Sequence, residues 1–409
     1  MKTVGIIAEY NPFHNGHKYM IEKAKELTGA DTAVVIMSGD FVQRGAPAVC
    51  DKYLRTQMAL SGGADIVFEL PVIYSLGSAE RFAEGAVRLL SSTLNINFIC
   101  FGSESGNIDT LYEFAINTED YSHTEEFRTN ISAAIKKGMS YPAAFETVIN
   151  EKFNVKDSSV YQPNNLLGIE YCRALYRLRK TGIYSKLPEL ITIKREGSSY
   201  HDAILSEYPS ATSVRNALQS NNIGSLRNSL PRSAFKMINE NMGKCLPIFE
   251  DDFNDMLYMR LNSSSDEDIR SIPDIHNDLK NKLINCRGKQ VVISELTAGL
   301  KNKAFTYSAI SRAIFKLLLS PVYTKAIQCN SANVPYLRAL GFKKDSSEFL
   351  RALRYSKTCN IITKPADGNM DDPSYLLDIY ASNLYNQVCS NKYKTGFTDE
   401  LKTGPVIIL

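Results

Sequence analysis

Short apolar runs alternate with helix-like segments through the first half of the chain, and this alternation constrains the possible folds more than any other feature. Four runs rich in β-branched and other apolar residues are expected to be buried parallel strands: residues 4–8, 33–37, 65–70 and 98–101. Three segments between them carry apolar residues at helical spacing: residues 17–27, 51–62 and 78–92. This alternation predicts a doubly wound α/β fold with a parallel sheet.

The rest of the chain is expected to be richer in helices. Residues 107–182 have a mainly helical pattern, residues 189–194 supply one more strand, and a helix is expected to start near Thr212. A polar stretch with Gly and Pro at residues 220–231 is the candidate domain boundary. With 409 residues the chain is long enough for two domains. We therefore expect an N-terminal doubly wound domain over residues 1–220 and a mainly α-helical C-terminal domain over residues 221–409.

The overall charge is nearly balanced, with 47 Lys and Arg against 44 Asp and Glu. This balance hides a segregated second half. Residues 251–280 hold 3 basic and 8 acidic side chains, whereas residues 281–360 hold 14 basic and 3 acidic ones. Arg312 and Lys316 lie four apart in a helix-like run over residues 307–319, so they should share one face. The segment is either a solvated basic face or a surface that binds a polyanion.

Cysteine spacing and hydropathy exclude several classes of protein. The eight cysteines are scattered, without a CxxC pair that could hold zinc or run thiol exchange. We expect reduced thiols and no metal site formed by side chains. The first residues form too short an apolar run for a signal peptide, and no run approaches the roughly 18 apolar residues of a membrane span. A cytoplasmic protein without a membrane segment is expected.

Two of the five histidines, His14 and His17, follow the first expected strand in the sequence Asn-Pro-Phe-His-Asn-Gly-His. In an open α/β sheet, ligands bind at the carboxyl ends of the strands, where the next helix offers free N–H groups to an anion. Gly16 permits a tight turn and the close approach of a phosphate. The two rings can donate N–H bonds to oxygens that gain charge during displacement at phosphorus. The structural alternative is that one histidine caps the helix while the other packs.

Two motifs in order along the chain point to one superfamily. His14-Asn-Gly-His17 resembles the HxGH signature of the nucleotidyltransferases related to class I aminoacyl-tRNA synthetases. Ser210-Ala-Thr-Ser-Val-Arg215 resembles their second signature, usually written SSTxIR. Thr212 is a candidate N-cap of the helix that follows, and Arg215, one turn later, can reach a phosphate. The resemblance implies a Rossmann-like domain that binds ATP.

Five stretches resemble a narrower family, the bacterial tRNA(Met) cytidine acetate ligases: residues 8–20, 38–47, 101–104, 163–168 and 194–202. This resemblance implies that acetate and ATP form acetyl-adenylate and pyrophosphate, and that the acetyl group then passes to N4 of the wobble cytidine in elongator tRNA(Met). It implies Mg²⁺ carried with ATP, and no obligate protein partner. Two alternatives stay open: a small-molecule adenylyltransferase or acetate-activating acid:AMP ligase of the same superfamily, and a non-catalytic RNA-binding protein.

The resemblance also assigns site residues. Gly102 would let a base or ribose lie against bare backbone, Asn164 would bond a base edge or ribose, and Arg195 would pair with phosphate. The expected ATP-binding residues are Ile7, Ala8, Glu9, Tyr10, Asn11, Pro12, Phe13, His14, Asn15, Gly16, His17, Lys18, Tyr19, Met20, Gly102, Asn164, Arg195 and Thr212. The expected catalytic residues are His14, His17, Asp40 and Arg215.

Asp40, Gln43 and Arg44 lie in the loop after the second expected strand, at the same sheet edge as His14. We hypothesise that this loop holds acetate or orients the cytidine amine, with Asp40 polarising an N–H and Arg44 facing a carboxylate or phosphate. The alternative is an Asx-type turn beside a surface arginine. Residues 200–202, Tyr-His-Asp, are candidates for a substrate loop.

The stretch from Lys301 to Arg312 resembles the family's basic helical segment, commonly Lys-Arg-Tyr-Thr followed by Arg-Ile-x-Arg. Ala304 and Ala309 stand where arginines are usual. Because phosphate contacts are collectively electrostatic, such a patch tolerates the loss of single charges. The expected tRNA-binding residues are Lys301, Lys303, Arg312 and Lys316, within a tRNA-binding segment over residues 281–360.

Overall fold

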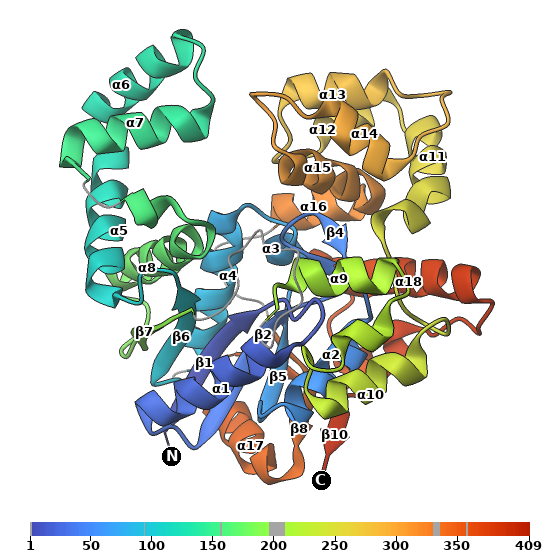
Figure 1. The fold of residues 1–409 in the computed structure, drawn as a ribbon. Helices are drawn as coiled ribbons and strands as arrows, with labels where there is room; N and C mark the ends of the chain where they lie inside the picture. Colours follow the sequence, from blue (N-terminus) through green and yellow to red (C-terminus); the bar gives the residue numbers. More distant parts are fainter. Residues whose placement is uncertain (1, 94, 156–157, 196–208, 330–335, 357–358) are drawn as a thin grey trace.

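The computed structural model describes residues 2–93, 95–155, 158–195, 209–329, 336–356 and 359–409. Its centre is an eight-stranded sheet with helices on both faces (Figure 1). The strand order is β10-β8-β5-β2-β1-β6-β7, and β9 pairs with β8. The strands are β1 (Thr3–Ala8), β2 (Thr32–Ser38), β5 (Ile66–Leu70), β6 (Phe98–Ser103), β7 (Glu189–Lys194), β8 (Leu337–Lys343), β9 (Ile361–Ile362) and β10 (Val406–Ile408).

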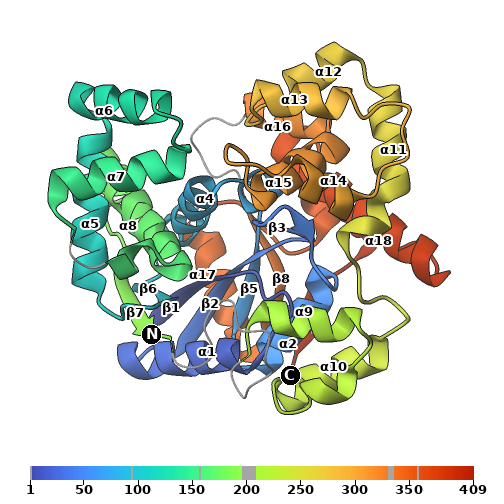
Figure 2. The same ribbon diagram turned by 45° about the horizontal axis from the view of Figure 1, so that its top comes forward.

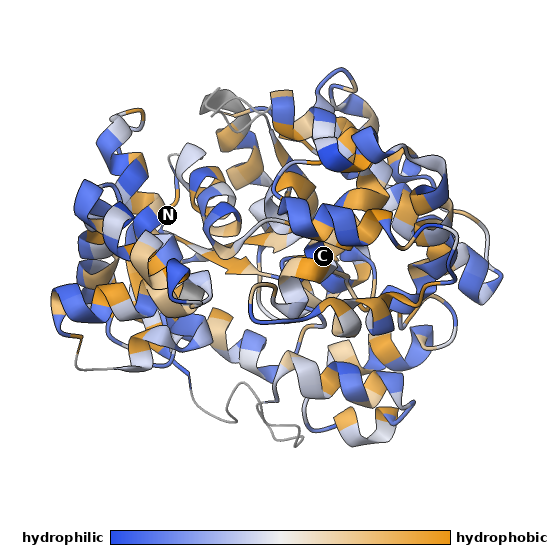
Figure 3. Cartoon of the chain, turned by 90° about the horizontal axis from the view of Figure 1, so that it is seen from above, coloured by the Kyte–Doolittle hydropathy of each residue, from blue (hydrophilic) through white to orange (hydrophobic). Residues whose placement is uncertain are grey.

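Five strands pair in parallel, each where the sequence predicts a strand: β1, β2, β5, β6 and β7. On β2, Val34 and Ile36 join one core cluster, whereas Val35 and Met37 join the other. Figure 3 shows the strands in hydrophobic colours between the surrounding helices. Burial of both faces explains why the runs of β1, β2, β5 and β6 are mostly apolar. The predicted doubly wound α/β fold is confirmed.

Both faces of the sheet are covered by helices, including the three that the sequence predicts before residue 93. The cluster around Val35 includes residues of α1 (Asn15–Thr28), α2 (Lys52–Ser61), α9 (Ala211–Gln219) and α10 (Arg232–Asn241). The cluster around Val34 includes residues of α3 (Val72–Ser75), α4 (Ala79–Ser92), α8 (Pro163–Thr181) and α18 (Pro373–Tyr393).

Two further groups of helices stand on opposite sides of the upper half of the molecule (Figure 1). One contains α5 (Ile108–Ser122), α6 (Glu125–Lys136) and α7 (Tyr141–Phe153). The other contains α11 (Asn254–Ser263), α12 (Asp266–Ser271), α13 (Asn277–Ile284), α14 (Ile293–Leu300), α15 (Tyr307–Leu319) and α16 (Val322–Cys329). None of the described helices is long and apolar enough to cross a membrane.

The chain does not divide at residue 220 in the way expected from its sequence. After α16 it returns to the sheet, where β8 lies antiparallel to β5 and β10 pairs with β8. Helix α17 (Ser347–Ser356) then lies at the lower end of the molecule, and α18 packs against α3 and α16 (Figure 1). Without β8, β5 would be an open sheet edge, which explains why the C-terminal segment belongs to this sheet.

Candidate active site

A cavity of about 460 Å³ opens at the carboxyl ends of β1, β6 and β7. This is the sheet edge at which ligands of doubly wound folds bind. Thirteen of the residues expected to bind ATP line the cavity: Ile7, Ala8, Glu9, Tyr10, Asn11, His14, Gly16, His17, Tyr19, Met20, Gly102, Asn164 and Arg195. The structure therefore brings together side chains from the first loop, β6, α8 and the end of β7.

The other expected residues lie outside this lining, as far as the described residues show: Pro12, Phe13, Asn15, Lys18, Asp40, Thr212 and Arg215. Phe13 is fully buried and packs edge-on against Tyr10. The Asn15 side chain donates to the Asn228 carbonyl, and Lys18 forms an exposed pair with Glu22. These side chains support the loop and the first turn of α1.

His14 and His17 together cap the N-terminus of α1. His14 Nδ1 accepts from the Gly16 backbone N–H at 3.1 Å, and His17 Nδ1 accepts from the His14 N–H at 3.2 Å. The two rings stack with centroids 3.6 Å apart. Since both Nδ1 atoms accept hydrogen bonds, each neutral ring carries its proton on Nε2. Capping and ligand binding are therefore compatible, because the cap leaves an Nε2–H donor on each ring that lines the cavity.

Both histidines are neutral over the physiological range. Burial lowers the pKa of His14 to about 3, and the nearby charges of Arg195 and Arg215 lower it further. Burial also lowers the pKa of His17 well below its usual value, with His14 and Arg195 contributing. The rings therefore act as hydrogen-bond donors, while Arg195 and Arg215 supply the positive charge.

Tyr10 adopts a backbone conformation that bulky residues rarely take. Its φ is +47°, in the left-handed region. Its ring lies 4.8 Å from that of His17 and 4.9 Å from that of Phe13, measured between centroids. Such strain persists where surrounding packing enforces it, commonly at functional sites. Tyr10 thus fixes the direction in which the loop enters α1.

The second signature lies beside the first. The N-cap of α9 is Ser210, whose hydroxyl accepts from the Ser213 N–H, so the expectation that Thr212 caps this helix is wrong. Thr212 instead accepts a hydrogen bond from Arg215, which also donates to the Asn11 carbonyl at 2.9 Å. Burial lowers the pKa of Arg215 to about 10, and the nearby charge of Arg44 contributes. Arg215 therefore links the second signature to the histidine loop.

Gly102 and Asn164 lie where the backbone approaches the cavity closely. A Cβ on Gly102 would lie 2.8 Å from Met20 Cε and 3.2 Å from Arg195 Cγ. The Asn164 side chain donates to Glu104 at 2.6 Å, and Glu104 also accepts the first N–H groups of α8. Glu104 thus holds Asn164 at the start of α8, a role that sequence reasoning missed.

Several cavity residues were not expected from the sequence. Ala79 and Phe82 come from α4, and Leu166, Leu167 and Tyr171 come from α8. They form an apolar wall, and Tyr171 packs against Phe101 with centroids 5.3 Å apart. Leu166 and Leu167 lie in the stretch 163–168 that resembles the ligase family, whereas the only sequence signal of Ala79, Phe82 and Tyr171 is helical spacing, which core residues share.

Gln43 and Arg44 reach the cavity at the tip of a small hairpin, β3 (Phe41–Val42) and β4 (Ala46–Pro47). The Gln43 N–H donates to the Glu9 carboxylate at 2.8 Å, which ties the hairpin to the first loop. Arg55 of α2 is fully buried and donates to the carbonyls of Glu9, Ser38, Gly39 and Cys50. This buried guanidinium, which sequence reasoning also missed, holds the loops after β1 and β2 in place.

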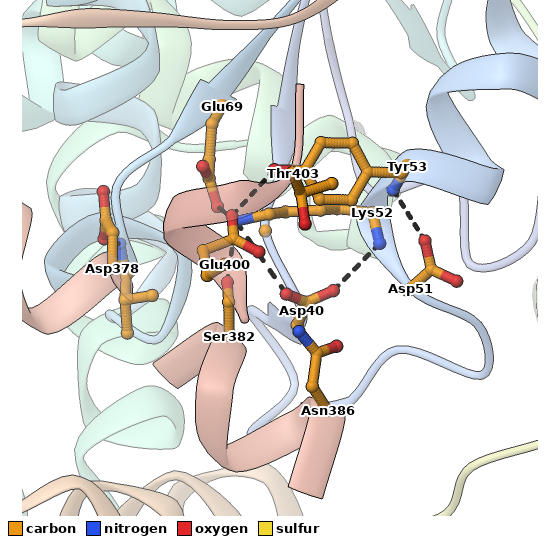
Figure 4. Close-up of polar contacts among 12 residues, drawn as sticks. Asp40, Asp51, Lys52, Tyr53, Glu69, Asp378, Ser382, Asn386, Glu400 and Thr403 are labelled. Atoms are coloured by element: carbon orange, nitrogen blue, oxygen red, sulfur yellow. Dashed lines mark hydrogen bonds and ion pairs between the residues drawn. The ribbon is translucent and has the colours of Figure 1, made fainter. Parts of the chain in front are cut away.

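Asp40 belongs to a buried ionic network rather than to the cavity lining (Figure 4). Its carboxylate accepts from the Lys52 backbone N–H at 2.9 Å, and it lies 3.9 Å from Lys52 Nζ. Burial raises the pKa of Asp40 to about 6, and Lys52 opposes this shift. The geometry gives Asp40 a bracing role, which differs from the expected contact with acetate or the cytidine amine.

The same network connects distant parts of the chain. Lys52 Nζ lies 2.7 Å from carboxylate oxygens of Glu69 and Glu400 and from the Ser382 hydroxyl. Arg338 of β8 pairs with Glu69 at 3.1 Å and with Glu400. These side chains are buried, and Figure 4 shows those of α2, β5, α18 and η6 (Glu400–Lys402) converging. The C-terminal segment is therefore held to α2 and β5 by charge.

The basic segment does not form one charged face. Lys316 is only 3% exposed, pairs with Asp274 at 3.7 Å, and has its pKa lowered to about 8 by burial. The expectation that it lies on an RNA-facing surface is wrong, because its charge is used inside the fold. Arg287 pairs with Asp266, and Lys343 pairs with Asp65. Part of the positive charge of residues 281–360 is thus neutralised within the structure.

The other three residues expected to bind tRNA are Lys301, Lys303 and Arg312. Lys301 and Lys303 are exposed on the loop before α15. Arg312 is half-buried and donates to the Gln43 carbonyl at 3.2 Å. The candidate substrate loop at residues 200–202 lies outside the described residues. Among the described residues, no cluster of three His, Cys, Asp or Glu could hold a metal ion.

The fold and these two signatures define a nucleotidyl transfer site. The family model described as HIGH Nucleotidyl Transferase matches residues 1–400, and the chain belongs to this family. Relatives named tRNA(Met) cytidine acetate ligase are 36% identical in Clostridium novyi, over all of both chains, and 37% identical in Clostridium acetobutylicum, over 95% of this chain and 96% of the relative. Within the HIGH nucleotidyl transferases, the chain therefore belongs to the tRNA(Met) cytidine acetate ligase family.

Solved structures agree with this assignment. The apo crystal structure of Thermotoga maritima TmcAL superposes with a TM-score of 0.87 at 28% identity, over all of both chains. A second structure of that protein, bound with alpha-thio ATP, gives a TM-score of 0.86 at the same identity and coverage. The family resemblance predicted from the sequence is confirmed.

Proposed function

We propose that this protein activates acetate with ATP as acetyl-adenylate and transfers the acetyl group to N4 of the wobble cytidine of elongator tRNA(Met). One observation carries the proposal: His14 and His17 present two neutral Nε2–H donors at the N-terminus of α1, in a cavity that Gly102, Asn164 and Arg195 also line. The substrates are inferred from membership of the ligase family.

In the first step an acetate oxygen attacks the α-phosphorus of ATP, and the bond to pyrophosphate breaks. His14 and His17 donate to phosphate oxygens, whose charge grows during the displacement. Arg195 and Arg215, whose charges act on the His14 ring, offset the negative charge of the phosphates. The N-terminus of α1 adds its free backbone N–H groups. Because acetate is itself the nucleophile, alignment and charge stabilisation suffice, and no covalent intermediate with the enzyme is needed.

In the second step the N4 amine of cytidine attacks the acetyl carbonyl carbon, AMP leaves, and the amine loses a proton. Acetyl-adenylate is a mixed anhydride from which AMP leaves readily, so the protein mainly has to position the base and keep water away. Lys301 and Lys303, exposed before α15, are the candidates for phosphate contacts with the tRNA.

Mg²⁺ would neutralise and orient the phosphates of ATP. Because the described residues contain no cluster of three metal-ligating side chains, we propose that the phosphate oxygens themselves provide its main ligands. The protein then contributes the hydrogen bonds and positive charges around that complex.

Acetate-dependent exchange of labelled pyrophosphate into ATP tests the first step. The assay is run with and without elongator tRNA(Met). We expect exchange that needs acetate and is lost in His14→Ala, whereas His123→Ala, which removes an exposed histidine at the C-terminal end of α5, retains it. Absence of exchange in both conditions would refute the proposed function.

A further inference from the structure

Helix α15 holds the hairpin that carries Gln43 and Arg44 into the cavity. The Ser311 hydroxyl donates to the Gly45 carbonyl, and the Arg312 guanidinium donates to the Gln43 carbonyl at 3.2 Å. Figure 2 shows β3 lying beneath α15. The two elements lie more than 260 residues apart in sequence, yet two side chains of α15 bond the hairpin backbone on either side of Arg44.

The contact between these elements is tight as well as polar. Gly45 has a φ of +79°, and a Cβ on it would lie 2.2 Å from the Arg312 backbone nitrogen. At the root of the hairpin, Phe41 packs against Phe315 of the same helix, with centroids 5.5 Å apart. The hairpin therefore cannot shift relative to α15 without breaking packing and hydrogen bonds together.

The far side of the hairpin tip is tied to the histidine loop. The Gln43 N–H donates to Glu9, and Arg44 lies close enough to Arg215 to lower the pKa of that residue. The hairpin tip thus connects α15 with the histidine loop. Arg312 is half-buried where it contacts the hairpin.

We propose that Arg312 is a positioning residue for acetate activation: it fixes the cavity wall formed by Gln43 and Arg44, and does not itself contact tRNA phosphate. The inference rests on the proposed function. A small displacement of a wall that faces the reacting groups costs rate even when no reacting contact is removed. Arg312 therefore supports the first step of the reaction, although it lies in the basic segment.

The test compares Arg312→Ala, Arg312→Lys and Ser311→Ala with the wild type in two assays. Pyrophosphate exchange without tRNA gives kcat and the KM values for acetate and ATP. Binding of elongator tRNA(Met) across a salt series gives affinity and the number of phosphates neutralised. Lys236→Ala, which removes an exposed cation from α10, is the matched control.

We expect Arg312→Ala to lower kcat/KM for acetate by about tenfold or more, with the KM for ATP nearly unchanged. Ser311→Ala should produce a smaller change of the same kind, and Arg312→Lys should restore part of the loss. The salt slope of tRNA binding should stay at its wild-type value in all three variants and in the control.

Unchanged exchange with a salt slope lower by about one would identify Arg312 as a phosphate contact and overturn the inference. If Arg312→Ala raised the KM values for acetate and ATP equally, and Arg312→Lys did not restore them, the role of Arg312 would be merely structural. That result would also overturn the inference. These outcomes are distinct from failure of the proposed function, in which the wild type itself shows no acetate-dependent exchange.

Discussion

Removing Arg338 should destabilise the whole protein, because this side chain compensates carboxylates that water cannot reach. Arg338 is 1% exposed and pairs with Glu69 and Glu400, each also 1% exposed. In Arg338→Met the two carboxylates would share Lys52 alone. Breaking a buried ion pair by removing one partner costs about 3–5 kcal/mol. A domain has a free energy of unfolding of only about 5–15 kcal/mol, so the loss is a large fraction of the total.

Urea denaturation followed by circular dichroism measures this change. The matched control is Arg351→Met on α17, where the arginine is exposed, with an expected change within about 0.5 kcal/mol. The double variant Arg338→Met with Glu400→Gln removes one charge of each sign, and it should recover part of the stability. A single variant within about 1 kcal/mol of the wild type would refute the claim that this network binds the C-terminal segment to the sheet.

Three further predictions concern the site. Nitrogen NMR should show both His14 and His17 as neutral Nε2–H tautomers at pH 6.5, since burial lowers both pKa values, and His14, whose pKa is lowered to about 3, should stay neutral down to about pH 4. The unfolded chain takes up these protons below about pH 6.5, so the free energy of unfolding falls as the pH drops from there towards 3. A ring that titrates near pH 6.5 would contradict this. Replacing Lys301 and Lys303 by Ala should weaken tRNA binding and lower its salt slope by up to about two, measured by filter binding; an unchanged slope would exclude them as phosphate contacts. Gly102→Val should raise the KM for ATP in pyrophosphate exchange at least about tenfold, because its side chain would meet Met20 and Arg195 inside the cavity; an unchanged KM would show that ATP does not approach this backbone.

Local patterns were enough to predict much of the sheet. The strands β1, β2, β5 and β6 are mostly continuous apolar runs, and burial on both faces leaves that signature in the sequence. Strand β8 was not predicted because Arg338, Gly341 and Lys343 interrupt its apolar pattern. In addition, its partner β5 lies far away in the sequence. Pairing over such distances depends on an open sheet edge, which no local pattern reveals.

The site residues were predictable where a motif determines the backbone conformation. They were less predictable where tertiary packing determines whether a side chain is buried or exposed. His14 and His17 follow from strand, turn and helix order. The burial of Lys316 does not, because its partner Asp274 lies in the turn between α12 and α13 and the sequence shows only a charge. Charge counts along a chain therefore indicate a binding face only after internal pairs have been removed.

Identification of the modified nucleoside in the RNA product decides whether the protein acetylates tRNA. The protein is incubated with ATP, labelled acetate and total tRNA, the tRNA is digested, and the labelled nucleoside is identified by mass spectrometry. We expect N4-acetylcytidine in the anticodon fragment of elongator tRNA(Met), dependent on ATP and absent with His14→Ala. Label confined to acetyl-adenylate, or found on other nucleosides, would contradict it.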